Sequence, residues 1–164
     1  MAKKKKTSVK KKASRKPARK TGKAGVRRAD PLAPVDVKHG RGPGPLEIGQ
    51  DLVARFNRGE FRQIEDTWWS PKIESVEGFG MAKAWRGRKA VEAKNNWWMQ
   101  DHVIHGASAE GPFVGADHFA VRFRMDVETK STGKREQMDE VGVYTVKDGK
   151  IVREQFMYLI PAGA

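Results

Sequence analysis

The chain has 164 residues, a formal net charge of +13 and no cysteine, which excludes disulfide bonds and thiolate–metal sites. The charge is unevenly distributed, because residues 1–44 hold 16 Lys and Arg against two Asp, whereas residues 45–164 hold 17 basic and 18 acidic side chains. No apolar run resembles a signal peptide or reaches membrane-spanning length, so we expect a cytoplasmic protein without membrane contact.

Residues 1–44 are predicted to be a disordered basic tail with a Pro/Gly linker, in front of one folded domain at 45–164. Between residues 2 and 28 the only large apolar side chains are Val9 and Val26, so ordering this segment would bury too little to offset the lost entropy. The tail is either a solvated arm or a sequence-independent binding arm for nucleic acid. The candidate nucleic-acid-binding residues are Lys3, Lys4, Lys5, Lys6, Lys10, Lys11, Lys12, Arg15, Lys16, Arg19 and Lys20.

Three helices are predicted in the first half of the domain, beginning near Pro45, Phe61 and Arg88. In the first, apolar side chains recur every three or four residues after a proline, which is typical of an amphipathic helix. A short strand over residues 72–77 separates the second helix from the third, and a loop that ends near Trp85 follows this strand.

Residues 119–158 are predicted to form a β-meander of three antiparallel strands. Apolar and charged side chains alternate in the first of them, which is the period of a half-buried strand. Ser131-Thr132-Gly133 and Asp148-Gly149 mark the two hairpin turns. Since helices come first and antiparallel strands last, we predict an α+β fold with helices packed on one face of a sheet.

A further strand is predicted from His102 to Glu110, with Gly111-Pro112 as its turn into the meander. Metal binding is not expected, because two His near the start of this strand lack a carboxylate at ligand spacing, and no cofactor motif is found. The outer face of the next strand carries Arg122, Arg124 and Asp126, whose mixed charges a symmetric partner could pair, so a homodimer is expected.

Four segments resemble a SnoaL-like domain of the nuclear transport factor 2 superfamily: FNRGEFRQIEDTWW, WRGRKAVEAKNNWW, VIHGASAEGPF and MDEVGVYTVKDGKIVREQFMY. The resemblance covers about residues 46–160. It implies a cone-shaped α+β barrel, with three N-terminal helices on a curved antiparallel sheet, an apolar pocket and frequent dimerisation. It does not imply one activity, since the superfamily includes cyclases, isomerases, dehydratases, hydrolases and proteins without catalysis.

Ketosteroid isomerases share this plan, and the resemblance allows their catalytic positions to be compared with this chain. Leu52 falls where those enzymes carry a Tyr, and Gly78 falls where they carry an Asp base. Glu77 lies next to the base position and would reach it only with a shift of one residue. Steroid isomerase chemistry is therefore not expected. Polyketide cyclases of the family use a carboxylate and a histidine on the sheet, which find no residue-by-residue match here.

The candidate catalytic residues are His105, Glu140 and Glu154, which lie on predicted strands among apolar or small neighbours. Desolvation raises the pKa of a carboxyl group and can make it a general acid or base near neutral pH. The alternative is that both Glu face solvent or pair with Arg across strands. The candidate substrate-binding residues are aromatic: Trp85, Trp97, Trp98, Phe123, Phe156 and Tyr158.

The length of the last hairpin turn decides how the two Glu are placed. A two-residue turn sets Glu140 opposite Met157, whereas a three-residue turn sets Glu140 opposite Phe156. Only the three-residue turn puts Glu140, Glu154 and Tyr158 on one face, and the sequence leaves both turns open.

We therefore predict a small-molecule-binding domain for an apolar ligand that is ring-sized or bears a carbonyl group. Its chemistry would be acid–base catalysis by a lyase, isomerase or cyclase. The alternative function is a non-catalytic dimeric module that the basic tail holds on nucleic acid.

Overall fold

The computed structural model of the protein describes residues 40–78 and 83–158. Residues 1–39 of the predicted tail and linker, with the eleven candidate nucleic-acid-binding residues, lie outside these ranges, whereas residues 40–44 are described. The described residues belong to one compact unit, and they contain every predicted catalytic and substrate-binding residue.

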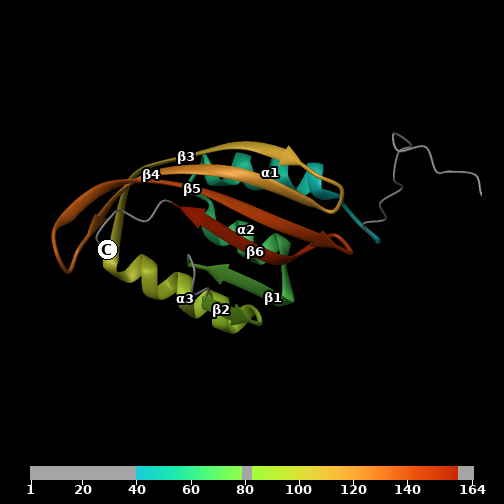
Figure 1. Ribbon diagram of the computed structural model, residues 1–164, viewed down its shortest axis with the longest axis horizontal. Helices are drawn as coiled ribbons and strands as arrows, with labels where there is room; N and C mark the ends of the chain where they lie inside the picture. The colour runs from blue at the N-terminus through green and yellow to red at the C-terminus, as the bar shows by residue number, and fades with distance from the viewer. Residues whose placement is uncertain (1–39, 79–82, 159–164) are drawn as a thin grey trace, which may run out of the picture. The chain divides into compact units, whose positions relative to one another are not determined.

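The described residues form three helices, α1 (Pro45–Phe56), α2 (Phe61–Trp68) and α3 (Arg88–Asp101) (Figure 1). A proline opens α1, where its missing N–H costs no helical hydrogen bond, and the apolar stripe of α1 buries Ile48 and Leu52. The three predicted helices are therefore confirmed. None of them is long and apolar enough to cross a membrane.

Six strands form one sheet in the order β2-β1-β6-β5-β4-β3. The strands are β1 (Trp69–Glu77), β2 (Lys83–Arg86), β3 (His102–Val114), β4 (His118–Thr129), β5 (Lys134–Lys147) and β6 (Lys150–Tyr158). Neighbours pair antiparallel except β1 and β6, which are parallel, so the sheet is mixed and not purely antiparallel as predicted. The α+β architecture of three helices on a sheet is confirmed.

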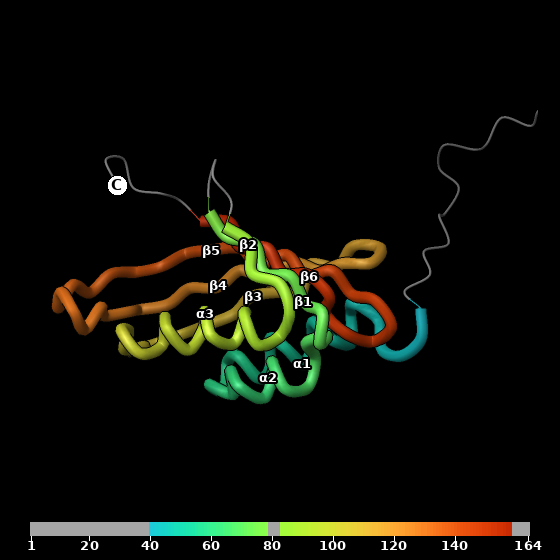
Figure 2. Tube along the Cα trace, turned by 90° about the horizontal axis from the view of Figure 1, so that it is seen from below, coloured from blue at the N-terminus to red at the C-terminus, as the bar shows by residue number. Residues whose placement is uncertain are grey.

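The helices cover one face of the sheet. Helix α1 packs against β3 and β4, and α3 packs against β1, and Figure 2 shows all three helices on the same side. The core between the layers is apolar, with Ile48, Ile73, Phe119 and Val121 completely buried. Burial of these side chains provides the main stabilisation of the domain and holds the concave face of the sheet toward the helices.

Two predicted boundaries are wrong. Trp85 lies in strand β2, which pairs with β1, and not at the end of a loop. Gly111-Pro112 lies inside β3, and the turn into β4 comes later, where the N–H of Gly115 donates to the carbonyl of His118. The strand continues because a register shift around this dipeptide absorbs the missing N–H of the proline.

The last hairpin has neither of the two predicted registers. Asp148-Gly149 forms a two-residue turn with both residues at positive φ, but a register shift close to the turn moves the pairing by one further residue. As a result, Glu140 lies opposite Tyr158, and Tyr144 lies opposite Glu154. Directly opposed residues share a face, so the two Glu and Tyr158 stand on the same side of the sheet.

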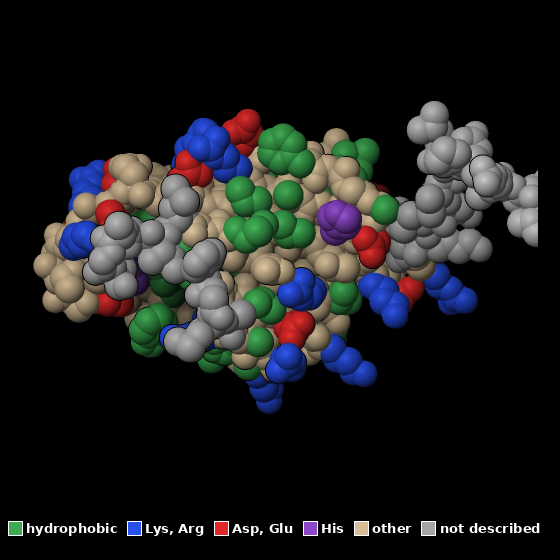
Figure 3. Space-filling model, in the orientation of Figure 1, with side chains coloured by type: hydrophobic (Ala, Val, Ile, Leu, Met, Phe, Trp, Pro, Cys, Tyr) green, Lys and Arg blue, Asp and Glu red, His purple; other side chains and the backbone are tan. Residues whose placement is uncertain are grey.

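The outer face of β4 and β5 pairs its charges within the chain. Asp139 accepts hydrogen bonds from Nε and Nη2 of Arg122 at 2.9 and 2.5 Å, and Asp126 accepts two from Arg135 at 2.7 Å. Figure 3 views the side of the sheet away from the helices and shows hydrophobic side chains gathered at its centre. Because the charges already have partners, they give no reason for a symmetric subunit, and the homodimer stays a prediction.

Candidate functional site

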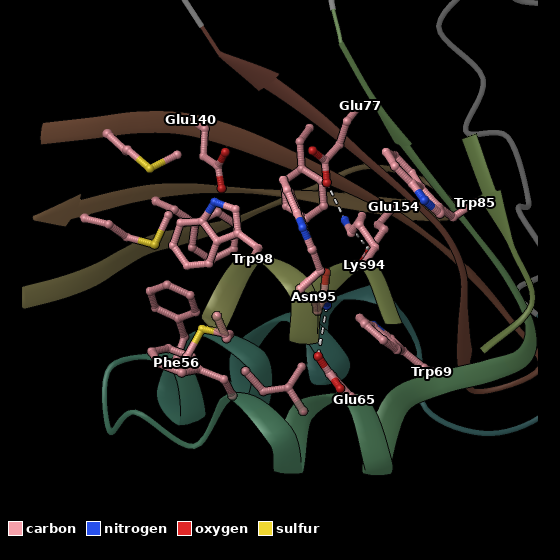
Figure 4. Close-up of a pocket in the computed structure, with 18 of the residues that line it drawn as sticks. Phe56, Glu65, Trp69, Glu77, Trp85, Lys94, Asn95, Trp98, Glu140 and Glu154 are labelled. Carbon is pink, nitrogen blue, oxygen red and sulfur yellow. Dashed lines mark hydrogen bonds and ion pairs between the residues drawn. The ribbon is translucent and has the colours of Figure 1, made fainter. Parts of the chain in front are cut away.

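The concave face of the sheet and the helices border a cavity of about 1250 Å³ (Figure 4). Its lining is rich in aromatic side chains and includes all six predicted substrate-binding residues: Trp85, Trp97, Trp98, Phe123, Phe156 and Tyr158. Trp97 lies at the rim, since 68 % of its surface is exposed. The lining also includes Glu140 and Glu154, so the sheet carries both predicted carboxyl groups to the cavity.

Glu154 is the most deeply buried charged residue of the site, with 2 % of its surface exposed. It stands on β6 between Ser75 of β1 and Tyr144 of β5. Its Oε1 has no hydrogen-bond partner among the described residues, and Nζ of Lys94 lies 3.9 Å from it. Burial raises the pKa of Glu154 to about 7, although Lys94 and a hydrogen bond with Ser75 favour its ionised form.

Glu140 stands on β5 directly between Phe123 of β4 and Tyr158 of β6. It is half-buried, and within the described part of the chain it forms no ion pair. Burial and, to a smaller degree, the charge of Glu77 raise the pKa of Glu140 to about 7, while Lys94 acts in the opposite direction. Two carboxyl groups of one cavity are thus poised near neutral pH.

Lys94 extends from α3 into the same cavity, with 10 % of its side chain exposed. Its ammonium group forms an ion pair with Glu77 and donates to Oγ of Ser75 at 3.0 Å. The same group lies 5.5 Å from the ring centroid of Trp85 and 5.2 Å from that of Phe156. This cation is therefore held by one carboxylate and two aromatic faces.

Lys94 and Glu77 form an ion pair in the site that was not predicted from the sequence. The one available signal for Lys94 was a charged residue on the apolar side of a predicted amphipathic helix. Glu77 ends β1, one residue before the position expected for a base in ketosteroid isomerases, and its side chain lines the cavity. The carboxylate of Glu77 is held in a close ion pair with Lys94. In this respect Glu77 differs from Glu140 and Glu154.

Tyr144 adds a buried hydroxyl group to the site. Burial, followed by the charges of Glu154 and Glu140, raises the pKa of Tyr144 well above its ordinary value. Its ring stacks on Phe119 with 5.0 Å between centroids and meets Phe156 edge to face. Tyr144 therefore stays protonated near neutral pH and acts as a hydrogen-bonding group and not as a base.

A polar contact joins α2 and α3 beside the cavity. Nδ2 of Asn95 donates to Oε1 of Glu65 at 3.0 Å, and Arg62 donates to the other carboxylate oxygen at 3.0 Å (Figure 4). Burial raises the pKa of Glu65, and these two partners act against burial. Because both oxygens of Glu65 have partners, this carboxylate holds the helices together.

The prediction that His105 borders the cavity is wrong. His105 is exposed, and its Nε2 lies 2.8 Å from Oε2 of Glu128. A register shift between Ile104 and Gly106 lies beside it, and Ile104 is the neighbour that lines the cavity. Over the described ranges, no group of three or more metal-ligating side chains could hold a metal ion.

The sequence was compared with protein families and with known structures. The model of the SnoaL-like domain family matches residues 47–158. A crystal structure from Mesorhizobium loti, provisionally named a SnoaL-like polyketide cyclase, is 42% identical, with 68% of this chain and 97% of that chain covered and a TM-score of 0.65. No protein of curated function matches the sequence.

Two more distant crystal structures show the fold alone. One from Jannaschia sp. CCS1, also provisionally named a SnoaL-like polyketide cyclase, is 16% identical, covers 71% of this chain and 88% of its own, and has a TM-score of 0.58. One from Bacillus subtilis, provisionally named an isomerase, is 17% identical, covers 69% of this chain and 84% of its own, and has a TM-score of 0.56.

Proposed function

The chain belongs to the family of SnoaL-like domains, and from this membership we propose that its cavity binds an apolar, ring-sized ligand with a carbonyl group and moves a proton on it. The observation that carries the proposal is the presence of two carboxyl groups, Glu140 and Glu154, each with a pKa of about 7, in one cavity lined by aromatic rings. Groups with such pKa values serve as general acid and base at neutral pH.

The environments of the two carboxyl groups divide the roles between them. Glu154 is enclosed, so its neutral form is favoured, and its carboxyl group, which lines the cavity, is assigned the hydrogen bond to the ligand's carbonyl oxygen. Glu140 is more open and takes the proton from the carbon next to that carbonyl in its ionised form. The electron pair of the broken C–H bond moves onto the carbonyl oxygen, where Glu154 stabilises the negative charge.

The product depends on where the electron pair then goes. If Glu140 returns the proton to another carbon of the ligand, the reaction is an isomerisation. If the carbon attacks a second carbonyl group of the same ligand, the reaction is a cyclisation, and the second oxygen takes up the proton. The name of the relative from Mesorhizobium loti includes a cyclase beside a carbohydrate phosphatase, and that of the relative from Bacillus subtilis is an isomerase.

The spacing of the carboxyl groups and the volume of the cavity limit the ligand. Glu154 lies opposite Tyr144, whose Cα is four residues and roughly 13 Å from that of Glu140 along β5. After the side chains extend into the cavity, the carbonyl group and the carbon next to it lie between them, and the one or two rings that carry these atoms occupy the rest of the cavity. A bicyclic ketone such as 1-tetralone is therefore a suitable probe.

The proposal is tested by exchange of the protons next to the carbonyl of 1-tetralone for deuterium, followed by NMR in D2O. We expect the protein to accelerate the exchange and Glu140→Gln to reduce the acceleration by about a hundredfold or more, the range of general-base contributions. Glu136→Gln is the matched control, because Glu136 is an exposed carboxylate on the same strand outside the cavity. No acceleration above glutamate in solution would exclude the catalytic function.

We further propose that residues 1–44 are a tail that attaches the domain at 45–164 to nucleic acid, because the positive charge is concentrated there. Replacing the basic residues between 3 and 20 by Gln should abolish binding to duplex DNA of mixed sequence. For the unaltered chain, the logarithm of affinity should fall steeply with the logarithm of salt concentration. Equal binding by both chains would contradict this function.

A further inference from the structure

Glu140 lies in a row of three side chains that cross the sheet. Phe123 of β4 and Tyr158 of β6 are its direct partners on the two sides, so the carboxylate has an aromatic side chain on each flank. Trp98 of α3 faces this row, and in Figure 4 the carboxylate of Glu140 points toward its indole. A carboxylate surrounded by aromatic rings is the usual environment of an organic cation in a protein.

The same cavity already holds a cation in this manner. The ammonium of Lys94 is bound by the carboxylate of Glu77 and by the ring faces of Trp85 and Phe156. The surroundings of Glu77 and of Glu140 thus each combine one carboxylate with aromatic rings. At Glu77, the cation between them is the ammonium of Lys94, which belongs to the chain itself. The arrangement at Glu140 contains, among the described residues, no basic side chain at ion-pair distance.

The charges of the lining are unequal. Four acidic side chains and two basic ones line the cavity: Glu65, Glu77, Glu140, Glu154, Lys83 and Lys94. Lys94 is engaged by Glu77, and Lys83 is exposed on β2. Glu65 is held by Arg62 and Asn95, and the enclosed Glu154 favours its neutral form. Glu140 is therefore the carboxyl group of the lining that is left to accept a positive charge.

We propose that the ligand carries a positively charged nitrogen, which binds at Glu140 between the aromatic rings of Phe123 and Tyr158. This inference rests on the proposed function, because it names the chemical class of the ligand for the same cavity: a ring-sized amine or quaternary ammonium compound with a carbonyl group. The positive charge favours the ionised form of Glu140, while the carbonyl group lies at Glu154.

Two probes of one shape separate this inference from the proposed function. In 4-acetyl-N,N,N-trimethylanilinium and 4-tert-butylacetophenone the rings and carbonyl groups are identical, and only the first bears a positive charge. Four tryptophans line the cavity, so quenching of their fluorescence reports binding: Trp69, Trp85, Trp97 and Trp98. The domain at 45–164 holds 17 basic and 18 acidic side chains, so its net charge gives a cation almost no unspecific attraction, and a preference for the charged probe arises locally.

We expect the unaltered protein to bind the charged probe about tenfold more tightly than the neutral one, which is 1.4 kcal/mol and within the range of a desolvated cation–π contact. Glu140→Gln should remove this preference, and Tyr158→Leu should reduce it, with circular dichroism verifying that both variants fold. Glu136→Gln should preserve the preference.

Three results would overturn the inference. If the neutral probe binds as tightly as the charged one, the cation is excluded while the proposed carbonyl ligand remains. If the preference survives in folded Glu140→Gln, the charge is recognised elsewhere. If neither probe binds, the proposed use of the cavity fails together with this inference.

Discussion

Asp139 and Glu140 are consecutive residues of β5 that face opposite sides of the sheet. On the outer side, hydrogen bonds from Arg122 and its positive charge lower the pKa of Asp139. On the inner side, burial raises the pKa of Glu140 to about 7. The period-two alternation of a strand therefore places two adjacent carboxyl groups in environments with opposite effects on protonation.

The same difference recurs along the sheet. On the outer face, Asp126 accepts two hydrogen bonds from Arg135, and solvent surrounds this pair. Inside, the one ammonium of Lys94 lies near both Glu77 and Glu154. On the outer face, each carboxylate has a basic partner that stabilises its ionised form. On the inner face, carboxyl groups outnumber the nearby ammonium groups, so some of them can take up and release protons near neutral pH.

The largest effect on stability is expected for Lys94→Met, which removes the buried cation of the inner face. The free energy of unfolding at pH 8 should fall by about 3 kcal/mol, because breaking a buried ion pair leaves Glu77 and Glu154 without their partner. The measurement is urea denaturation. Adding Glu77→Gln should restore most of the loss, and a loss in the single variant below about 1 kcal/mol would show that the inner charges behave like exposed ones.

The next effect is the pH dependence that Glu154 confers. Because its folded-state pKa of about 7 lies above its ordinary value of 4.5, its contribution to stability is fully present below about pH 4.5 and is lost as pH rises through 7. Between pH 5 and 8 the free energy of unfolding should fall by about 2–3 kcal/mol. Glu154→Gln should flatten this decline, and an unchanged slope in that variant would exclude Glu154 as its source.

Glu140→Gln should remove a smaller part of the same decline, about 1 kcal/mol, because Glu140 is only half-buried and solvent reduces the cost of its charge. The sign is again a loss of stability with rising pH, since the pKa is raised in the folded state. Thermal unfolding of the single variants and of the double variant measures the two contributions. A larger effect at Glu140 than at Glu154 would contradict the expectation that the more deeply buried carboxyl group contributes more to the pH dependence.

The smallest effect is expected on the outer face. Asp139→Asn breaks the pair with Arg122, but both side chains are exposed and solvent screens the interaction. The pKa of Asp139 is lowered, so its contribution is complete above its ordinary value of 3.8 and is lost only at lower pH. Melting temperatures between pH 5 and 8 should therefore differ from those of the unaltered protein by a constant, small amount. A difference that grows with pH would contradict the distinction between the faces.

The α+β architecture could be predicted from the sequence, because helices and strands each show a characteristic period of apolar residues within a short segment. Alternation placed the apolar side of β4 toward the helices, and helical spacing gave α1, α2 and α3. The aromatic lining was also predicted, since indole and phenyl groups on these elements must be buried. Strand β2 was missed because four residues show too little alternation to identify a strand.

The geometry of the site depended on two irregularities that no local pattern shows. A register shift near the last turn sets Glu140 opposite Tyr158, which continuous pairing did not allow. A second shift lies beside His105, whose ring is exposed and next to Glu128. The contact of Lys94 with Glu77 joins residues 17 positions apart on a helix and a strand, so it became visible only in the folded chain.

The proposed proton transfer depends most directly on the protonation of the two inner carboxyl groups, Glu140 and Glu154. A 13C NMR titration of protein labelled at the glutamate side-chain carboxyl groups measures it without any ligand. We predict two resonances that titrate near pH 7, one absent in Glu140→Gln and the other absent in Glu154→Gln. If all glutamates titrate below about pH 5, the range of ordinary carboxyl groups, the inner face has no poised acid or base and the proposed proton transfer is contradicted.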